Sequence, residues 1–173
     1  MSILPVFIPH AGCPHQCVFC NQKTISGQKL AAVAGAKEQL VRWRSWLRPS
    51  AANEAAFYGG SFTGLPLELQ EELLTLTDAL LAGGFNGSVR LSTRPDYIDE
   101  ERLQLLQRHG VRLVELGVQS LDDRVLVAAE RGHTASQVAP AVALLQRFGF
   151  QVGLQLMVGM PEQSFDSVQE TVR

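Results

Sequence analysis

Short apolar runs alternate along the whole chain with longer segments of helical spacing. The apolar runs lie at residues 3–8, 56–58, 89–92, 113–118 and 152–158, and polar or glycine-rich turns separate them from the helical segments. This order is typical of repeated β-α units around a parallel sheet. Near-continuous runs such as LVELGV and VGLQLMV favour strands that are covered on both faces. We therefore predict an α/β fold with five parallel strands.

The segments between the runs carry apolar residues on one helical face. Pro66 opens a helix that Gly83-Gly84 closes, and a second helix covers residues 138–148. The apolar positions are Leu69, Leu73, Leu76 and Leu80 in the first helix, and Val138, Val142, Leu145 and Phe148 in the second. Gly110 and Gly149 each follow a helical segment. Both are predicted to adopt the left-handed conformation that ends a helix before a strand.

The domain organisation follows from the number of strands. Five strands do not close a barrel, and a helical pattern that begins near Ser164 continues to the last residues, ETVR. We expect residues 1–173 to form one domain, which is the amino-terminal fragment of a longer chain.

Charge and composition limit the partners and the compartment. The net charge of −2 and the pI of about 6.1 provide no basic surface for nucleic acid or anionic membrane. The amino terminus has no basic segment ahead of its apolar stretch, and no window approaches the ~18 apolar residues of a membrane span. We predict a cytoplasmic protein without a membrane partner. In that reducing compartment, clustered thiols favour a metal or catalytic site over disulfides.

All three cysteines of the chain lie within eight positions, in the sequence GCPHQCVFC directly after the first strand. The short loop allows Cys13, Cys17 and Cys20 to converge on one centre. Three thiolates can bind three irons of a cubane cluster and leave the fourth iron open to an external ligand. Zinc is the alternative, with His10 or His15 as a fourth ligand, although zinc sites normally combine two separated ligand pairs.

The C-x3-C-x2-C spacing, the aromatic residue before the third cysteine and the place after a first strand resemble the signature of the radical S-adenosylmethionine (SAM) superfamily. Further similar motifs are GGSFTG, LSTRPDYID, ELGVQS, RGHT and LMVGMP, so that the resemblance spans nearly the whole chain. The elongator-catalytic-subunit-like group and the oxygen-independent coproporphyrinogen III oxidase-like group are the most similar. The resemblance implies the amino-terminal portion, about five β-α units, of a TIM-like (β/α)6 barrel.

The resemblance also implies the cofactors and the reaction. Cys13, Cys17 and Cys20 would hold a [4Fe-4S] cluster, and SAM would chelate the open iron. One electron, from a reductant such as flavodoxin or ferredoxin, then cleaves SAM to a 5′-deoxyadenosyl radical that abstracts hydrogen from a substrate. The enzyme would be an oxidoreductase or a transferase. No protein residue is assigned as catalytic, because the cofactors carry the chemistry.

Several residues are implied as cofactor contacts by their positions in the motifs. Phe19 would shield the cluster near the adenine, and the turn at Gly59, Gly60 and Ser61 would approach the methionine amino group. Gln119 matches a glutamine that contacts SAM, and Arg131 matches an arginine near the SAM carboxylate or ribose. Arg94 could bind a carboxylate or phosphate, or remain a solvated loop arginine.

Two of these positions differ from the pattern of the relatives. Ser92 stands where they have glutamate, and Gln155 stands where they often have aspartate, although an amide can still bond ribose hydroxyls. Glu115 is a carboxylate within an apolar strand and is expected to pair across the sheet, because a buried unpaired charge is costly. His133 is interpreted as a loop histidine.

The sequence leaves three functions of different classes open. The first is the radical SAM enzyme, whose substrate the sequence does not identify. The second is a zinc-stabilised binding module. The third is an elongator-like protein that acts on transfer RNA, which the resemblance suggests and the charge of this chain does not support.

Overall fold

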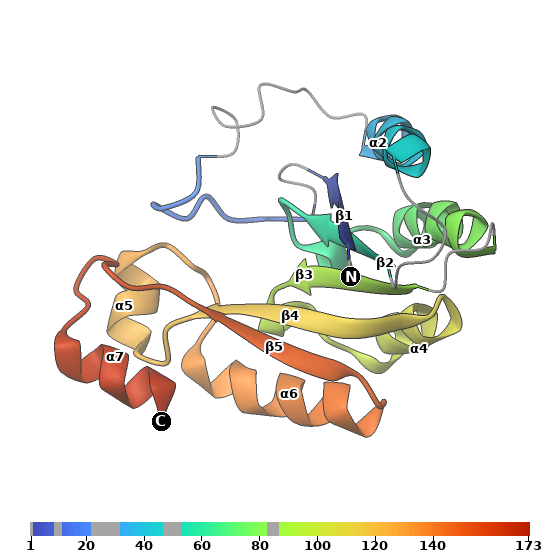
Figure 1. Ribbon diagram of the computed structural model, residues 1–173. Coiled ribbons are helices and arrows are strands. Elements are labelled where there is room, and N and C mark those ends of the chain that lie inside the picture. Colours follow the sequence, from blue (N-terminus) through green and yellow to red (C-terminus); the bar gives the residue numbers. More distant parts are fainter. Residues whose placement is uncertain (1, 9–11, 22–31, 47–52, 83–86) are drawn as a thin grey trace.

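Five parallel strands form the centre of the protein. The computed structural model describes residues 2–8, 12–21, 32–46, 53–82 and 87–173 (Figure 1). The strands pair in chain order, and they are β1 (Ser2–Phe7), β2 (Asn53–Tyr58), β3 (Ser88–Thr93), β4 (Val111–Gln119) and β5 (Gln151–Leu156). All five predicted strands are confirmed. β5 ends at Leu156, two residues before the predicted end.

Helices follow the strands. The α-helices are α2 (Ala32–Trp46), α3 (Leu67–Ala82), α4 (Glu100–Arg108), α5 (Asp123–Ala128), α6 (Val138–Arg147) and α7 (Phe165–Val172). Of these, α2, α3, α4 and α6 lie along the outer side of the curved sheet, whereas α5 and α7 lie near the carboxyl ends of β4 and β5 (Figure 1). Short 3-10 helices are η1 (Phe62–Gly64), η2 (Pro95–Tyr97) and η3 (Ala135–Gln137). The two predicted amphipathic helices are α3 and α6, and Gly110 and Gly149 have the predicted positive φ, of 67° and 81°. Gly83 and Gly84 lie outside the described residues.

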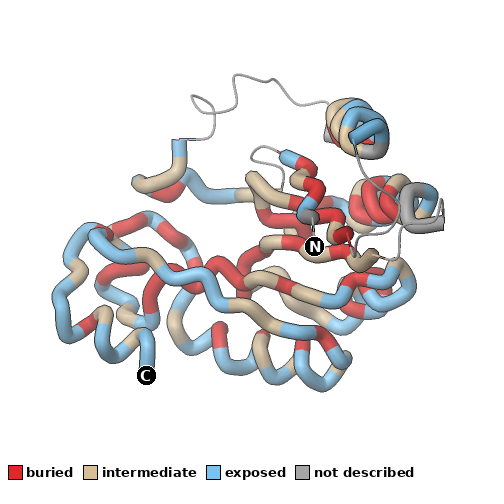
Figure 2. The backbone as a smooth tube through the Cα atoms, in the orientation of Figure 1, coloured by how far each residue is buried: buried red, intermediate tan, exposed pale blue. Residues whose placement is uncertain are grey.

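The core lies between the sheet and the helices, and the opposite face of the sheet is more polar. In β3, Val89, Leu91 and Thr93 are buried, whereas the alternate residues are partly exposed. The buried apolar side chains of β3 and β4 pack with those of α3, α4 and α6. Figure 2 shows burial concentrated along the inner strands. The helices therefore cover one face, and the other face is free to carry polar groups.

β5 differs from the strand expected from its apolar sequence. Among the described residues it pairs with β4 alone, and it carries the exposed side chains Leu154 and Leu156. An apolar run thus indicated the strand correctly, but the inference that both faces are covered was wrong for this edge strand.

Parallel pairing brings the carboxyl ends of all five strands to one edge of the sheet. The cysteine loop follows β1, and η1 and η2 follow β2 and β3. β4 and β5 end in Gln119 and Leu156, respectively. Ligands of parallel α/β proteins bind at this edge. Within the described residues, no helix has the length and hydrophobicity that crossing a bilayer requires.

We expect Leu91→Ala to lower the free energy of unfolding by about 2–5 kcal/mol, because it removes a fully buried side chain from the centre of the sheet. Val127→Ala is the control, since Val127 is 77% exposed. Urea unfolding of both variants measures the difference. A Leu91→Ala protein as stable as the Val127→Ala protein would contradict the position of this core.

Candidate cofactor site

A cavity of about 260 Å³ opens at the carboxyl edge of the sheet. Of the predicted site residues, all but Ser61 line it: Cys13, Cys17, Phe19, Cys20, Gly59, Gly60, Ser92, Arg94, Gln119, Arg131 and Gln155. The lining also includes Tyr58, Thr93 and Gly117, which the sequence did not single out, and His15, one histidine of the zinc alternative. Residues from separate segments of the chain thus meet around one space.

The cysteine loop contributes all three thiols to this cavity, and none is in a disulfide. A turn joins two of them, because the Cys20 amide donates to the Cys17 carbonyl oxygen at 2.9 Å. In the part of the chain that the structure describes, no three His, Cys, Asp or Glu side chains are gathered closely enough to hold a metal ion. The three cysteine side chains line one cavity, and their sulfur atoms are free. Three free sulfurs are the donor set that three irons of a cluster require. His10, one histidine of the zinc alternative, lies outside the described residues.

Close backbone contacts hold the loop against the rest of the protein. Gly12, with φ of 73°, lies so near η1 that a Cβ atom would stand 2.0 Å from the Ser61 carbonyl oxygen. Gly64 is equally restricted from the other side, where a Cβ atom would stand 2.2 Å from the Gly12 carbonyl oxygen. Glycine at both positions therefore permits the start of the loop to contact the turn after β2.

The middle of the loop contacts the segment after α5. The Val18 amide donates to the Ala129 carbonyl oxygen at 3.2 Å. The imidazole of His15 lies against Gly132, where any Cβ would come within 2.6 Å of ring atoms. Phe19 packs against a small apolar cluster of Val125, Ala129 and Met160, to which Met157 also belongs. Phe19 thus joins the cavity to a second, smaller core.

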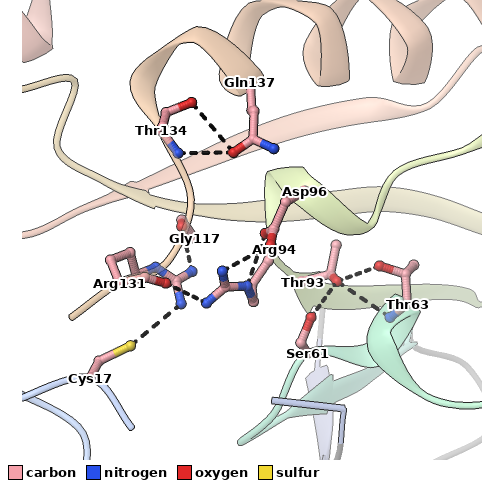
Figure 3. A network of polar contacts seen from close by, with 10 residues as sticks. All are labelled: Cys17, Ser61, Thr63, Thr93, Arg94, Asp96, Gly117, Arg131, Thr134 and Gln137. Carbon is pink, nitrogen blue, oxygen red and sulfur yellow. Dashed lines mark hydrogen bonds and ion pairs between the residues drawn. The ribbon is translucent and has the colours of Figure 1, made fainter. Parts of the chain in front are cut away.

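A group of hydroxyls fixes the turn that follows β2 (Figure 3). Thr93 Oγ1 lies 3.0 Å from Ser61 Oγ and 2.5 Å from Thr63 Oγ1, and all three residues are buried. Ser61 therefore stabilises the turn on the side away from the cavity. Gly59 and Gly60 form the part that lines the cavity, and Gly59 has φ of 89°. The absence of a side chain on these glycines lets a ligand approach the backbone closely.

Two buried guanidinium groups stand beside the thiols (Figure 3). Arg94 donates to both carboxylate oxygens of Asp96 at 2.9 Å. Arg131 donates to Cys17 Sγ at 3.8 Å. Burial raises the pKa of the Cys13 thiol, and the positive charges of Arg131 and Arg94 oppose that rise. The site therefore combines an apolar environment with positive charge directed at sulfur.

Gln119 ends β4 in a strained conformation. Its φ of 68° is left-handed, which is uncommon for a residue other than glycine. Gly117 provides the space for two side chains of the site, because a Cβ there would stand 2.9 Å from Arg131 Nη2 and 3.0 Å from Gln119 Nε2. Strained residues of this kind cluster at functional sites.

A polar network lies on the sheet face adjoining the cavity. Glu115 accepts hydrogen bonds from Ser92 Oγ at 3.1 Å and from Gln155 Nε2 at 3.2 Å. Arg90 bridges Glu115 and Glu54, with nitrogen–oxygen distances of 3.5 Å. The predicted cross-sheet pairing of Glu115 is confirmed. Within this network, Gln155 Nε2 also donates to Ser92 Oγ at 3.2 Å.

His133 lies in the loop between α5 and η3, as interpreted from the sequence, but it is buried there. Its side chain is 4% exposed, and both ring nitrogens lack a hydrogen-bond partner among the described residues. Burial and the nearby Arg131 and Arg94 lower the pKa of His133 to about 4. The residue is therefore neutral at pH 7.

The comparisons with known proteins agree with this site. A family model described as the Radical SAM superfamily matches residues 7–173. A tRNA uridine(34) acetyltransferase from Methanocaldococcus infernus is 25% identical over 96% of this chain and 38% of its own length. The structure of Elp3 from the same archaeon, with residues 1–46 deleted, has a TM-score of 0.69 at 22% identity and covers 98% of this chain and 41% of that one. Coproporphyrinogen III oxidase (HemN) from Escherichia coli has a TM-score of 0.71 at 21% identity, with 99% and 40% covered.

The chain therefore belongs to the radical SAM superfamily, and its sheet is part of a TIM-like barrel. This confirms the predicted family and fold class, and the superfamily is one of enzymes. The superfamily's cofactors are a [4Fe-4S] cluster and SAM, as predicted. The chain spans about two fifths of the length of the relatives described above.

We expect Gly12→Ala to destabilise the protein by about 1–3 kcal/mol, because the new Cβ meets backbone atoms and φ is positive. Gly35→Ala is the matched control, since nothing lies within 4 Å of its Cβ position in α2. Chemical unfolding compares the two variants. If both unfold alike, the contact between Gly12 and Gly64 does not hold the loop.

We expect the stability contributed by neutral His133 to be lost as pH falls. The folded pKa of about 4 lies below the ordinary value of 6.5, so the unfolded chain binds a proton first, and stability declines between these two pH values. Unfolding of the wild type and His133→Gln across pH 4–7 should give a steeper decline for the wild type. Parallel curves, or an imidazole signal that titrates near pH 6.5 by NMR, would contradict the burial of His133.

Proposed function

We propose that Cys13, Cys17 and Cys20 bind three irons of a [4Fe-4S] cluster and that SAM occupies the adjoining cavity. One observation carries this proposal: the three free thiols and nearly all implied SAM contacts line the same cavity. When bound, these cofactors would supply one-electron reductive cleavage of a sulfonium, with the electron from an external reductant, and through it the means to abstract hydrogen from a substrate. The protein binds and orients these groups and excludes water.

The roles of individual residues follow from what each can offer to the cavity. The backbone at Gly59 and Gly60 would approach the methionine amino group. The amide of Gln119 and the guanidinium of Arg131 would meet the polar parts of SAM, and Phe19 would cover the cluster with its ring. Ser61 would act indirectly, because its hydroxyl already contacts Thr93.

Ser92 and Gln155 would contact SAM from the sheet face. Both are held by Glu115, which leaves the carbonyl oxygen of the Gln155 amide available as an acceptor for a ribose hydroxyl. Arg94 would contribute positive charge near a SAM carboxylate. Its nitrogens contact Asp96 and a backbone carbonyl, so its direct share in binding would be small.

Transfer RNA is a second candidate partner, which the similarity to a tRNA uridine(34) acetyltransferase favours. The net charge of −2 on this chain does not contribute the basic surface that RNA binding uses.

We propose that residues 1–173 are the amino-terminal part of a larger cytoplasmic enzyme. This enzyme would receive its electron from flavodoxin or ferredoxin. Any basic surface would lie in the remaining part.

We expect the full-length protein, reconstituted anaerobically with iron and sulfide, to hold about four irons and to convert SAM to 5′-deoxyadenosine under reduction. Cys17→Ala should abolish product formation, because one iron loses its ligand. Val18→Ala is the control within the same loop, since its side chain is 54% exposed. Iron analysis and chromatography of the nucleoside product measure both effects.

Metal analysis separates the alternatives. One tightly bound zinc and no cleavage of SAM would support the zinc-stabilised module and reject the radical enzyme. Retained activity in Cys17→Ala would reject the ligand assignment. For the RNA candidate, binding of tRNA to the full-length protein that weakens steeply with salt supports it, and no binding at low salt rejects it.

A further inference from the structure

Arg94 is oriented by three polar contacts and is almost inaccessible to solvent. Its side chain is 2% exposed, and two of its nitrogens contact the two oxygens of Asp96 at 2.9 Å (Figure 3). Its remaining nitrogen, Nη1, donates to the Arg131 carbonyl oxygen at 2.7 Å. The bidentate pair with Asp96 fixes the plane of the Arg94 guanidinium. The third contact then holds the Arg131 carbonyl at a fixed place relative to that plane.

Arg131 lies in a tight turn with two left-handed neighbours. Glu130 has φ of 53° and Gly132 has φ of 77°. The Arg131 amide donates to the Leu126 carbonyl oxygen at 2.9 Å, and Arg131 Nη2 donates to the Gly117 carbonyl oxygen at 2.6 Å. A further polar contact is the one to Cys17 Sγ at 3.8 Å. The backbone of this strained turn thus determines how near the guanidinium comes to the sulfur.

We propose that Asp96 and Arg94 are positioning residues, which hold Arg131 so that its guanidinium lies beside Cys17 and sets the reduction potential of the cluster bound there. This inference rests on the proposed role of Cys17 as a cluster ligand. Asp96, Arg94, Arg131 and Cys17 form one continuous series of contacts from η2 to the cysteine loop (Figure 3).

The physical basis is the charge that the cluster gains on reduction. A cation within hydrogen-bond distance of a ligand sulfur stabilises the reduced form, and hydrogen bonds to sulfur raise cluster potentials. The effect is large because Arg131 is only 7% exposed, so that solvent screens its charge weakly. A displaced guanidinium would therefore lower the potential and make the cluster harder to reduce.

Arg94→Lys tests positioning without changing charge. Lysine keeps the positive charge but cannot form the planar bidentate pair and the contact to the Arg131 carbonyl together. We expect the midpoint potential, measured by an EPR-monitored redox titration of the reconstituted full-length protein, to shift downward. An unchanged potential in Arg94→Lys, at equal iron content, would overturn the proposal.

Asp96→Asn gives a test of sign. Removal of a negative charge would by itself raise the potential, whereas a displaced Arg131 lowers it. We expect a downward shift, and an upward shift would overturn the role of Asp96. The control is Asp99→Asn, which removes the same charge three residues later. Asp99 pairs with Arg102, and in the described part of the chain this pair has no contact to the thiols. Asparagine also retains the helix cap that Asp99 forms, and we expect no shift.

Hydrogen–deuterium exchange of the cluster-free protein tests the positioning separately from the cluster. Arg94→Lys should accelerate exchange of the Arg131 and Val18 amides by about tenfold, because both amides bond to the segment that Arg94 holds, and Asp99→Asn should not. Unaltered exchange in Arg94→Lys would overturn the positioning role. If the wild type assembles no cluster, the proposed function fails, and exchange alone then decides whether Arg94 positions Arg131.

Discussion

Parallel pairing of five strands in chain order is the constraint on which the rest of this structure depends. It brings every strand's carboxyl end to one edge, so that loops distant in sequence become neighbours. The cysteine loop after β1 and the turn after α5 are far apart in sequence, yet Arg131 contacts Cys17. No local feature of either segment produces that contact. The sheet register produces it, and the helices on the opposite face stabilise the register.

Charge within this edge is arranged in two separate groups. Arg94 and Arg131 lie beside the sulfurs and share one nearby carboxylate, that of Asp96. On the sheet face, Glu115 and Glu54 share one guanidinium, that of Arg90. The first group is positive where the proposed cluster and SAM carboxylate would lie, and the second is negative. Polar ligands that enter the cavity therefore meet a gradient of potential across it.

The sequence was sufficient for features that depend on local periodicity. The leucine stripe predicted α3, and the glycines after α4 and α6 predicted left-handed helix ends. Features that depend on tertiary contacts were not accessible. The sequence could not show that the Ser61 hydroxyl turns toward Thr93, or that Arg94 points inward to Asp96. It also could not show that His133 is buried, because RGHT is typical of a polar loop. Most of the residues that line the cavity were predicted from the family resemblance, because its motifs come from positions that are distant in the sequence.

The docking of the cysteine loop has a consequence for the lifetime of the proposed site. The loop is held through the Gly12 backbone, the His15 ring and the Val18 amide, and none of these three contacts uses a sulfur atom. Loss or oxidation of iron would leave these anchors intact. The polypeptide around the proposed centre would then stay in place to receive new iron and sulfide.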